Sequence, residues 1–216
     1  MMRTMRVVLS GTNDQHRPPH EVANGVVVAA LEIPDRVTAL LDGLSAVPGL
    51  ISERASISNL ESLSEIHDPA YLAFLKDTCT KLKGEPLFPS VFPYRAEFAI
   101  NSGQAGTYCF DTHTPLLSGT FDAACRMASA AIQAADAVAQ GESVAYALGR
   151  PPGHHAERAK YGGYSYLNST ALAANAPRPT ARISGDNDIE SGHELSAGEG
   201  RMSDAELQVL QQAGLR

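Results

Sequence analysis

Two adjacent histidines, His154 and His155, are the residues of this chain best suited to chemistry. Histidine changes its charge near neutral pH, so two copies could serve as a base and an acid. They follow the sequence RPPG at residues 150–153, in which the prolines fix the backbone and the glycine permits close approach. The pattern therefore predicts a stiff loop that presents two proton-transfer groups. An isolated histidine pair is also common on ordinary surfaces, so the flanking residues must decide.

The element that carries this loop is a strand, and a glycine-rich segment follows it. Residues 144–148, with the sequence VAYAL, form a short apolar run typical of a buried strand. A strand that ends in a rigid polar loop is a common way for an α/β protein to present catalytic groups. Downstream come Gly162, Gly163 and Tyr164, and then Tyr166, Asn168 and the alanine-rich sequence TALAA.

The sequence RPPGHHA, followed by this glycine and aromatic segment, resembles the histone deacetylase superfamily. Within that superfamily it looks most like the bacterial acetylpolyamine amidohydrolases. The resemblance covers residues 5–174. It implies zinc-dependent hydrolysis of linear acetyl amides, with an acetylated polyamine or acetyl-lysine as the substrate.

The resemblance also implies roles for individual residues. His154 and His155 match tandem histidines that handle protons around a metal-bound water. Gly163 matches a glycine that lines the substrate tunnel, and Tyr164 stands where the family usually has a phenylalanine in the tunnel wall. Asp111 and its neighbour His113 are candidates for meeting a substrate amine, although a carboxylate beside a loop can equally serve as a cap or turn residue.

The remaining elements predict a three-layer α/β/α sandwich with a mainly parallel sheet that is truncated at its C-terminal side. The resemblance implies that this fold is of the arginase/deacetylase type. We expect a strand at residues 5–10, a helix over residues 32–44 and a long helix over residues 120–140 that has Thr120 as its N-cap. Residues 11–25 are interpreted as a polar surface loop. The apolar residues expected on one face of the first helix are Val37, Leu40, Leu41 and Leu44.

A second segment, HDPAYLAFL at residues 67–75, also resembles a family signature. Asp68 and the proline after it predict a helix start, with Tyr71 facing the core and His67 in a structural role. Residues 84–105 are rich in proline, glycine and aromatic side chains. By the resemblance, they would narrow the channel and could support a homodimer.

The metal-ligand motif of the family, DxDxHxGNG, has no clear counterpart here. Asp186, Asp188 and Glu190 repeat its spacing with a glutamate in place of histidine, while an ungapped match places the metal histidine at His193. Neither alignment restores the motif, so Asp188 and His193 are the only metal candidates. We therefore expect residues 1–174 to be an N-terminal portion of a deacetylase domain and residues 175–216 a poorly ordered tail. Such a chain would bind zinc weakly and lack activity; the alternative is a non-catalytic fragment or binding protein that keeps the pocket loops.

Composition sets broader bounds. The chain has 216 residues, 44% of them hydrophobic, and a formal net charge of −7. The length suits one domain with a real core, and the acidic balance argues against nucleic acid as a partner. Three widely spaced cysteines form neither a disulfide framework nor a zinc finger, which favours a cytoplasmic protein. No stretch approaches the ~18 apolar residues that span a membrane, so we expect no membrane partner.

Overall fold

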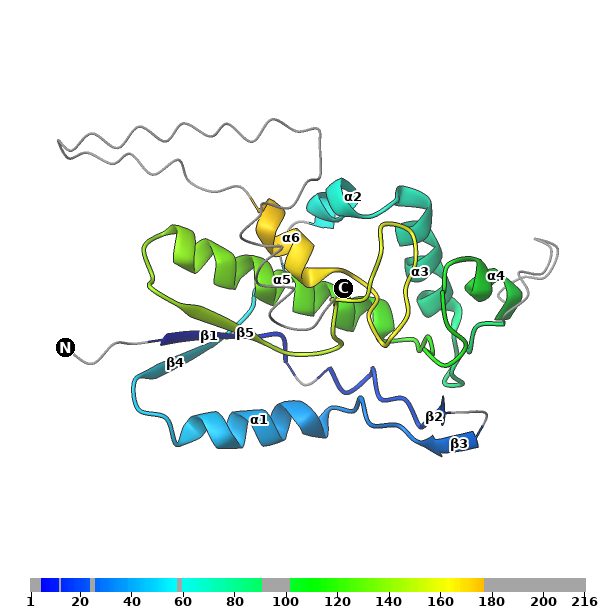
Figure 1. Cartoon of the computed structure of the whole chain (residues 1–216), viewed down its shortest axis with the longest axis horizontal. Coiled ribbons are helices and arrows are strands. Elements are labelled where there is room, and N and C mark those ends of the chain that lie inside the picture. Colours follow the sequence, from blue (N-terminus) through cyan, green and yellow to red (C-terminus); the bar gives the residue numbers. More distant parts are fainter. Residues whose placement is uncertain (1–4, 12, 24–25, 58–59, 91–101, 177–216) are drawn as a thin grey trace, which may run out of the picture. The chain divides into compact units, whose positions relative to one another are not determined.

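A computed structural model of the chain describes residues 5–11, 13–23, 26–57, 60–90 and 102–176, all within the unit Met1–Pro179. Its centre is a three-stranded sheet with strand β1 (Met5–Leu9) between β4 (Leu50–Arg54) and β5 (Ala145–Leu148) (Figure 1). Both neighbours run parallel to β1. Parallel neighbours require crossover connections, and the chain between these strands supplies the helices that cover the sheet.

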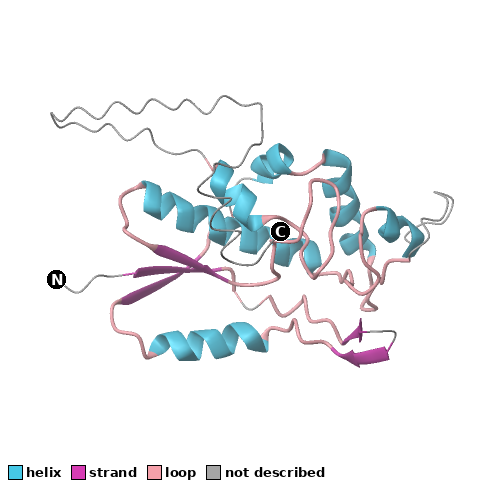
Figure 2. Ribbon diagram, in the orientation of Figure 1, coloured by secondary structure: helices cyan, strands magenta, loops and turns pink. Residues whose placement is uncertain are grey.

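Helices lie on both sides of this sheet (Figure 2). Helix α5 (Thr120–Ala139) packs on β1 and β5, and α6 (Ser169–Asn175) packs on α5. Helix α1 (Asp35–Ser45) lies on the opposite side of the sheet. The predicted three-layer α/β/α arrangement with a parallel sheet is confirmed.

The main core lies between α5, three earlier helices, and the segment from Tyr161 to Leu172 that follows β5. The earlier helices are α2 (Leu63–Ile66), which a 3-10 turn (Leu60–Ser62) precedes, α3 (Pro69–Lys81) and the short α4 (Ser102–Thr107). Asp68 caps α3 as predicted, because its carboxylate accepts the N–H groups of Ala70 and Tyr71. The largest fully buried apolar side chains of this core are those of Tyr71, Leu75, Leu116, Tyr161, Tyr166 and Leu167.

An antiparallel hairpin replaces part of the predicted surface loop. Its strands are β2 (His20–Ala23) and β3 (Val26–Ala29). The valines of β3 are exposed, Val27 by 64%. The β-branched valines of β3 favour an extended backbone and pair with β2, whereas the polar residues before β2 favoured the prediction of a loop.

Three expectations about element ends and faces were wrong. Helix α1 begins at Asp35, and of its predicted apolar face only Val37 is buried, while Leu40 is 49% exposed. Gly119, not Thr120, is the N-cap of α5, because the Thr120 hydroxyl instead accepts the Leu117 N–H group. Strand β5 is not buried: it forms an edge of the described sheet, and Tyr146 is 41% exposed.

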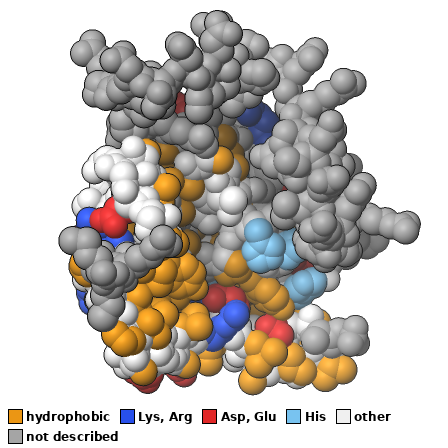
Figure 3. All heavy atoms as spheres, turned by 60° about the vertical axis from the view of Figure 1, so that its left-hand side comes forward, with side chains coloured by type: hydrophobic (Ala, Val, Ile, Leu, Met, Phe, Trp, Pro, Cys, Tyr) orange, Lys and Arg blue, Asp and Glu red, His pale blue; other side chains and the backbone are white. Residues whose placement is uncertain are grey.

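Apolar side chains therefore remain on the outside of the sheet layers. Figure 3 shows broad apolar areas on one face of the molecule. The exposed large apolar residues next to or within the sheet strands include Val47, Ile51, Val144 and Tyr146. None of the described helices is both long and apolar enough to cross a bilayer.

Candidate deacetylase-type site

The loop that carries the tandem histidines follows β5, and at two glycines its backbone passes very close to other parts of the chain. A side chain at Gly149 would collide with the hydroxyl of Ser10, and one at Gly153 would lie 2.4 Å from the Leu167 carbonyl oxygen. Glycine is therefore required at both positions for the chain to pass. The peptide bond between Arg150 and Pro151 is cis. The sequence prediction of a closely packed, stiff loop agrees with this geometry.

His154 and His155 lie side by side at the surface end of this loop. Their ring centroids are 4.1 Å apart, with an angle of 47° between the planes. Partial burial, and secondly the neighbouring His155, lower the pKa of His154 below its ordinary value. His154 is therefore neutral near pH 7 and able to accept a proton, as a general base must be. The backbone N–H of His155 donates to the Ser165 hydroxyl at 3.3 Å.

A tight turn at Gly163 and Tyr164 packs against these histidines. Gly162 and Ser165 exchange two backbone hydrogen bonds across the turn, and both central residues have positive φ, 54° at Gly163 and 61° at Tyr164. A side chain at Gly163 would lie 2.6 Å from Cδ2 of His155, so the glycine lets the turn touch the imidazole. A positive φ at tyrosine costs free energy and needs support from neighbouring groups. We name residues 162–165 the wall turn.

Asp111 lies behind the wall turn and accepts hydrogen bonds from several groups. Oδ1 accepts the N–H groups of His113 (3.0 Å) and Thr114 (2.8 Å). Oδ2 accepts the Thr114 hydroxyl and the Gly163 N–H, each at 2.7 Å. Burial opposes ionisation of this carboxyl, but these hydrogen bonds hold the pKa of Asp111 below its ordinary value. The carboxylate is thus ionised and turned inward.

Tyr164 is fixed at both its backbone and its hydroxyl. Its N–H donates to Oγ1 of Thr114 at 3.1 Å. Burial, together with the charge and hydrogen bond of Glu21, raises the pKa of the Tyr164 hydroxyl to about 12. The ring of His113 lies 5.8 Å from that of Tyr164. The structure therefore brings all five predicted site residues close together. His155 contacts the wall turn at Gly163, and Asp111 accepts the N–H group of the same glycine.

Similarity to known proteins shows the family of this chain. Residues 30–184 match the model of the histone deacetylase domain. The chain belongs to the histone deacetylase family.

Several relatives within and beyond bacteria are similar to this family member. The acetylpolyamine amidohydrolase of Mycoplana ramosa is 32% identical over 178 residues, which cover 79% of this chain and 52% of that protein. The mouse polyamine deacetylase HDAC10 is 35% identical over 149 residues, 67% of this chain and 20% of that protein. The crystal structure of the acetylpolyamine aminohydrolase from Burkholderia pseudomallei has a TM-score of 0.71 at 30% identity, covering 80% of this chain and 52% of that one. The chain spans about half the length of the bacterial relatives it matches.

A buried ion pair anchors the histidine loop of this deacetylase-family chain. The Arg150 guanidinium donates to the Glu32 carboxylate through Nε (3.0 Å) and Nη2 (2.6 Å), and both side chains are almost fully buried. Nη2 also donates to the Glu32 carbonyl at 2.8 Å. The arginine carbonyl in turn accepts the Asn13 side-chain amide at 2.6 Å. Segments from three parts of the chain thus meet at the start of the loop.

Two buried histidines belong to the supporting structure. His16 Nδ1 lies 3.0 Å from the Thr120 hydroxyl, and burial together with the charge of Arg150 lowers the pKa of His16 to about 3. His67 accepts the Asn168 N–H at Nε2 (2.9 Å), so its Nδ1 carries the proton donated to the Glu157 carbonyl (3.0 Å). Burial lowers the pKa of His67 as well. The predicted structural role of His67 matches these contacts.

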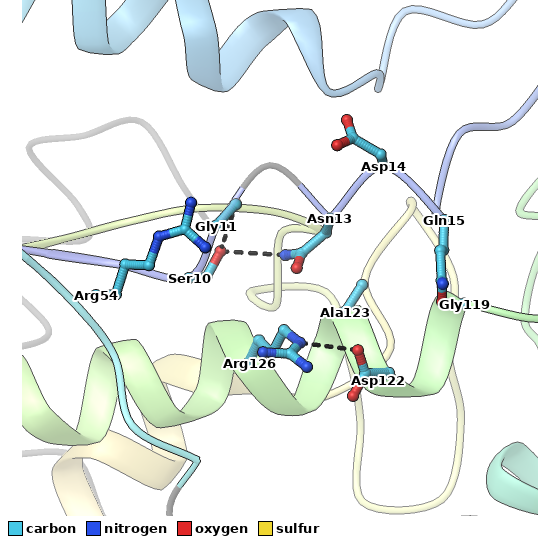
Figure 4. Close-up of a pocket in the computed structure, with 10 residues that line it drawn as sticks. All are labelled: Ser10, Gly11, Asn13, Asp14, Gln15, Arg54, Gly119, Asp122, Ala123 and Arg126. Carbon is cyan, nitrogen blue, oxygen red and sulfur yellow. Dashed lines mark hydrogen bonds and ion pairs between the residues drawn. The ribbon is translucent and has the colours of Figure 1, made fainter.

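A separate cavity of about 570 Å³ opens beyond the carboxyl ends of β1 and β4 (Figure 4). One of its arginines, Arg126, is paired with Asp122 at 2.8 Å. None of the five predicted site residues lines it. Its lining residues are Ser10, Gly11, Asn13, Asp14, Gln15, Arg54, Gly119, Asp122, Ala123 and Arg126.

The described residues do not supply a zinc site. Within them, no group of three or more histidine, cysteine, aspartate or glutamate side chains is placed to hold a metal. The metal candidates Asp188 and His193 lie outside the described residues, as do Asp186, Glu190 and most of the predicted tail. Half of the predicted dimer segment 84–105 also lies outside, at residues 91–101.

Sequence reasoning missed the residues that support the site. Glu32 was read as part of a helix, yet its partner Arg150 is 118 positions away in the chain. Thr114 and Ser165 gave no signal, because a hydroxyl that accepts from a distant backbone group has no local pattern. The one available hint was a charged Glu32 beside the apolar residues Leu31 and Ile33.

Proposed function

We propose that this chain recognises acetylated amines, of the acetylpolyamine or acetyl-lysine class, at the surface formed by the tandem histidines and the wall turn. The observation that carries the proposal is the contact of Gly163 with the His155 ring. His155, with His154 beside it, lies against the wall turn, and the proposal is that the Tyr164 ring of this turn offers an apolar surface to a thin linear amide. The family membership and the names of the bacterial relatives support this substrate class.

The roles of the residues follow from their chemistry. His154 is neutral near pH 7 and can accept a hydrogen bond, and the adjacent His155 ring lies against Gly163. Gly163 leaves room along the histidines, and the Tyr164 ring excludes water from one side of the amide. A cationic polyamine end also suits a chain with a net charge of −7.

Amide hydrolysis by this chain alone is not part of the proposal. The family's zinc-ligand motif has no matching sequence here, and the described residues hold no set of ligands that could replace it. Any tight zinc site would have to draw its ligands from residues outside those described. We therefore propose a chain that binds acetylated amines without turning them over, with residues 1–174 as the deacetylase portion.

The test combines binding, metal analysis and turnover. Titration with N-acetylputrescine should shift the ring signals of His154 and His155 in NMR spectra, with a dissociation constant of about millimolar size, and unacetylated putrescine is the matched control. After dialysis the protein should hold no stoichiometric zinc and release no acetate. Unmoved histidine signals would contradict the recognition proposal. Zinc that is lost in Asp188→Ala or His193→Ala, with turnover that needs His154, would contradict the proposed inactivity.

A further inference from the structure

We infer that Asp111 and Thr114 position the wall turn, and that Asp111 acts through Gly163 and Tyr164 instead of touching the substrate. The inference rests on the proposed function, because it assigns the part these residues play in holding the acetylated amine. It replaces the direct contact with a substrate amine that the sequence suggested for Asp111.

The Asp111 carboxylate is already occupied by hydrogen-bond donors from the protein. Oδ1 and Oδ2 of Asp111 each accept two hydrogen bonds, at 2.7–3.0 Å, and the Cys109 thiol lies 3.6 Å from Oδ1. The side chain is only 10% exposed. A carboxylate held inward by four donors has few free directions in which to meet a solvated ammonium group.

Asp111 and Thr114 are hydrogen-bonded to two successive N–H groups of the wall turn. The Gly163 N–H donates to Oδ2 of Asp111, and the next N–H, from Tyr164, donates to Oγ1 of Thr114. The Thr114 hydroxyl donates its own proton to Asp111 and is fully buried. Successive amides of the turn are therefore fixed by one carboxylate and the hydroxyl bonded to it.

These hydrogen bonds offset backbone strain in the wall turn. A tyrosine at a φ of 61° is disfavoured unless its surroundings hold it there. The hydrogen bonds that the Gly163 and Tyr164 N–H groups make to Asp111 and Thr114 provide that support. Because Gly163 touches His155, any movement of the turn changes the space beside the imidazole.

The experiment compares three variants that differ in hydrogen-bonding groups. Thr114→Val keeps the shape of the side chain but removes the hydroxyl, whereas Thr114→Ser keeps the hydroxyl. Asp111→Asn replaces one carboxylate oxygen by an NH₂ group. Where that group faces the Gly163 N–H and the Thr114 hydroxyl, donor meets donor and those hydrogen bonds are lost. We expect Thr114→Val and Asp111→Asn to weaken N-acetylputrescine binding by about tenfold and to shift the His155 ring signals. Thr114→Ser should bind within about twofold of the wild type and leave those signals in place.

The His155 signals separate this inference from the proposed function. If the wild type does not bind N-acetylputrescine, the proposed function fails, but the positioning role is still decided by the ring signals of the free variants. Unchanged signals in Thr114→Val and Asp111→Asn would overturn it. Should these variants not fold, hydrogen exchange of the wild type decides: the Gly163 and Tyr164 amides must exchange at least about 100-fold slower than free amides. Fast exchange at both would overturn the inference.

Discussion

Around the tandem histidines, segments far apart in the sequence are joined by buried polar contacts, whereas β4 and α1 expose most of their side chains. The histidine loop, the wall turn and residues 109–114 are joined by hydrogen bonds between buried or half-buried groups. On the other side, Leu40 is 49% and Ile51 53% exposed. The difference shows that buried hydrogen bonds within the site fix its geometry. The side of the sheet that faces α1 buries few side chains and contributes little to the core.

Among substitutions that test this difference, we expect the largest effect from replacing Arg150, which forms the buried ion pair with Glu32. Arg150→Met leaves the Glu32 carboxylate buried without its partner, which should lower the free energy of unfolding by about 3–5 kcal/mol. Urea denaturation measures this loss. The double variant Arg150→Met/Glu32→Leu should recover much of the stability, because no buried charge then remains. As a control, Arg17→Ala removes an exposed pair with Asp35 and should leave the midpoint unchanged. Equal effects of the two single variants would show that the buried pair does not anchor the loop.

A second test uses the pH dependence of stability. His16 has a folded pKa of about 3, lower than its ordinary value, so below pH ~6.5 the unfolded chain binds a proton that the folded chain does not. Stability should therefore be full above that pH and fall by about 1 kcal/mol per pH unit as the pH drops towards 3. His16→Asn should reduce this slope, and His67, whose pKa is also lowered, should account for part of the remainder. An unchanged slope in His16→Asn would contradict the buried neutral state.

The smallest expected effect comes from the open side of the sheet. Ile51→Thr keeps a β-branched residue on β4 and should change the free energy of unfolding by no more than about 0.5 kcal/mol. The matched core variant Leu75→Ala, at a residue 1% exposed, should cost about 2–5 kcal/mol. Thermal or urea denaturation distinguishes the two. A large loss in Ile51→Thr would mean that a partner covers this face in solution, and the contrast between the two regions would then disappear.

The sequence predicted the elements that have strong local signals. Strand β1, helix α5, the cap at Asp68 and the close approach at Gly153 were all expected from residue type and spacing, whereas Gly163 was expected from the family resemblance. Strand β4, with the sequence LISER, was missed because its hydrogen bonds come from β1, which is distant in the sequence. The inward carboxylate of Asp111 was equally hidden, since its donor Gly163 is 52 residues away. Residue chemistry thus indicated which groups gather, but not which of them support the others.

The hydrogen bonds of Asn168 restrict the chain between Ala156 and Asn168 at both of its ends. Its N–H donates to His67 Nε2, its side-chain amide donates to the Ala156 carbonyl at 3.0 Å, and its side-chain oxygen accepts the Ala171 N–H at 3.0 Å. One residue therefore joins three segments at fixed positions. Because Ala156 and Asn168 are held in place, an inserted or deleted residue between them must be absorbed within that segment, for which the exposed residues 157–160 offer the most room.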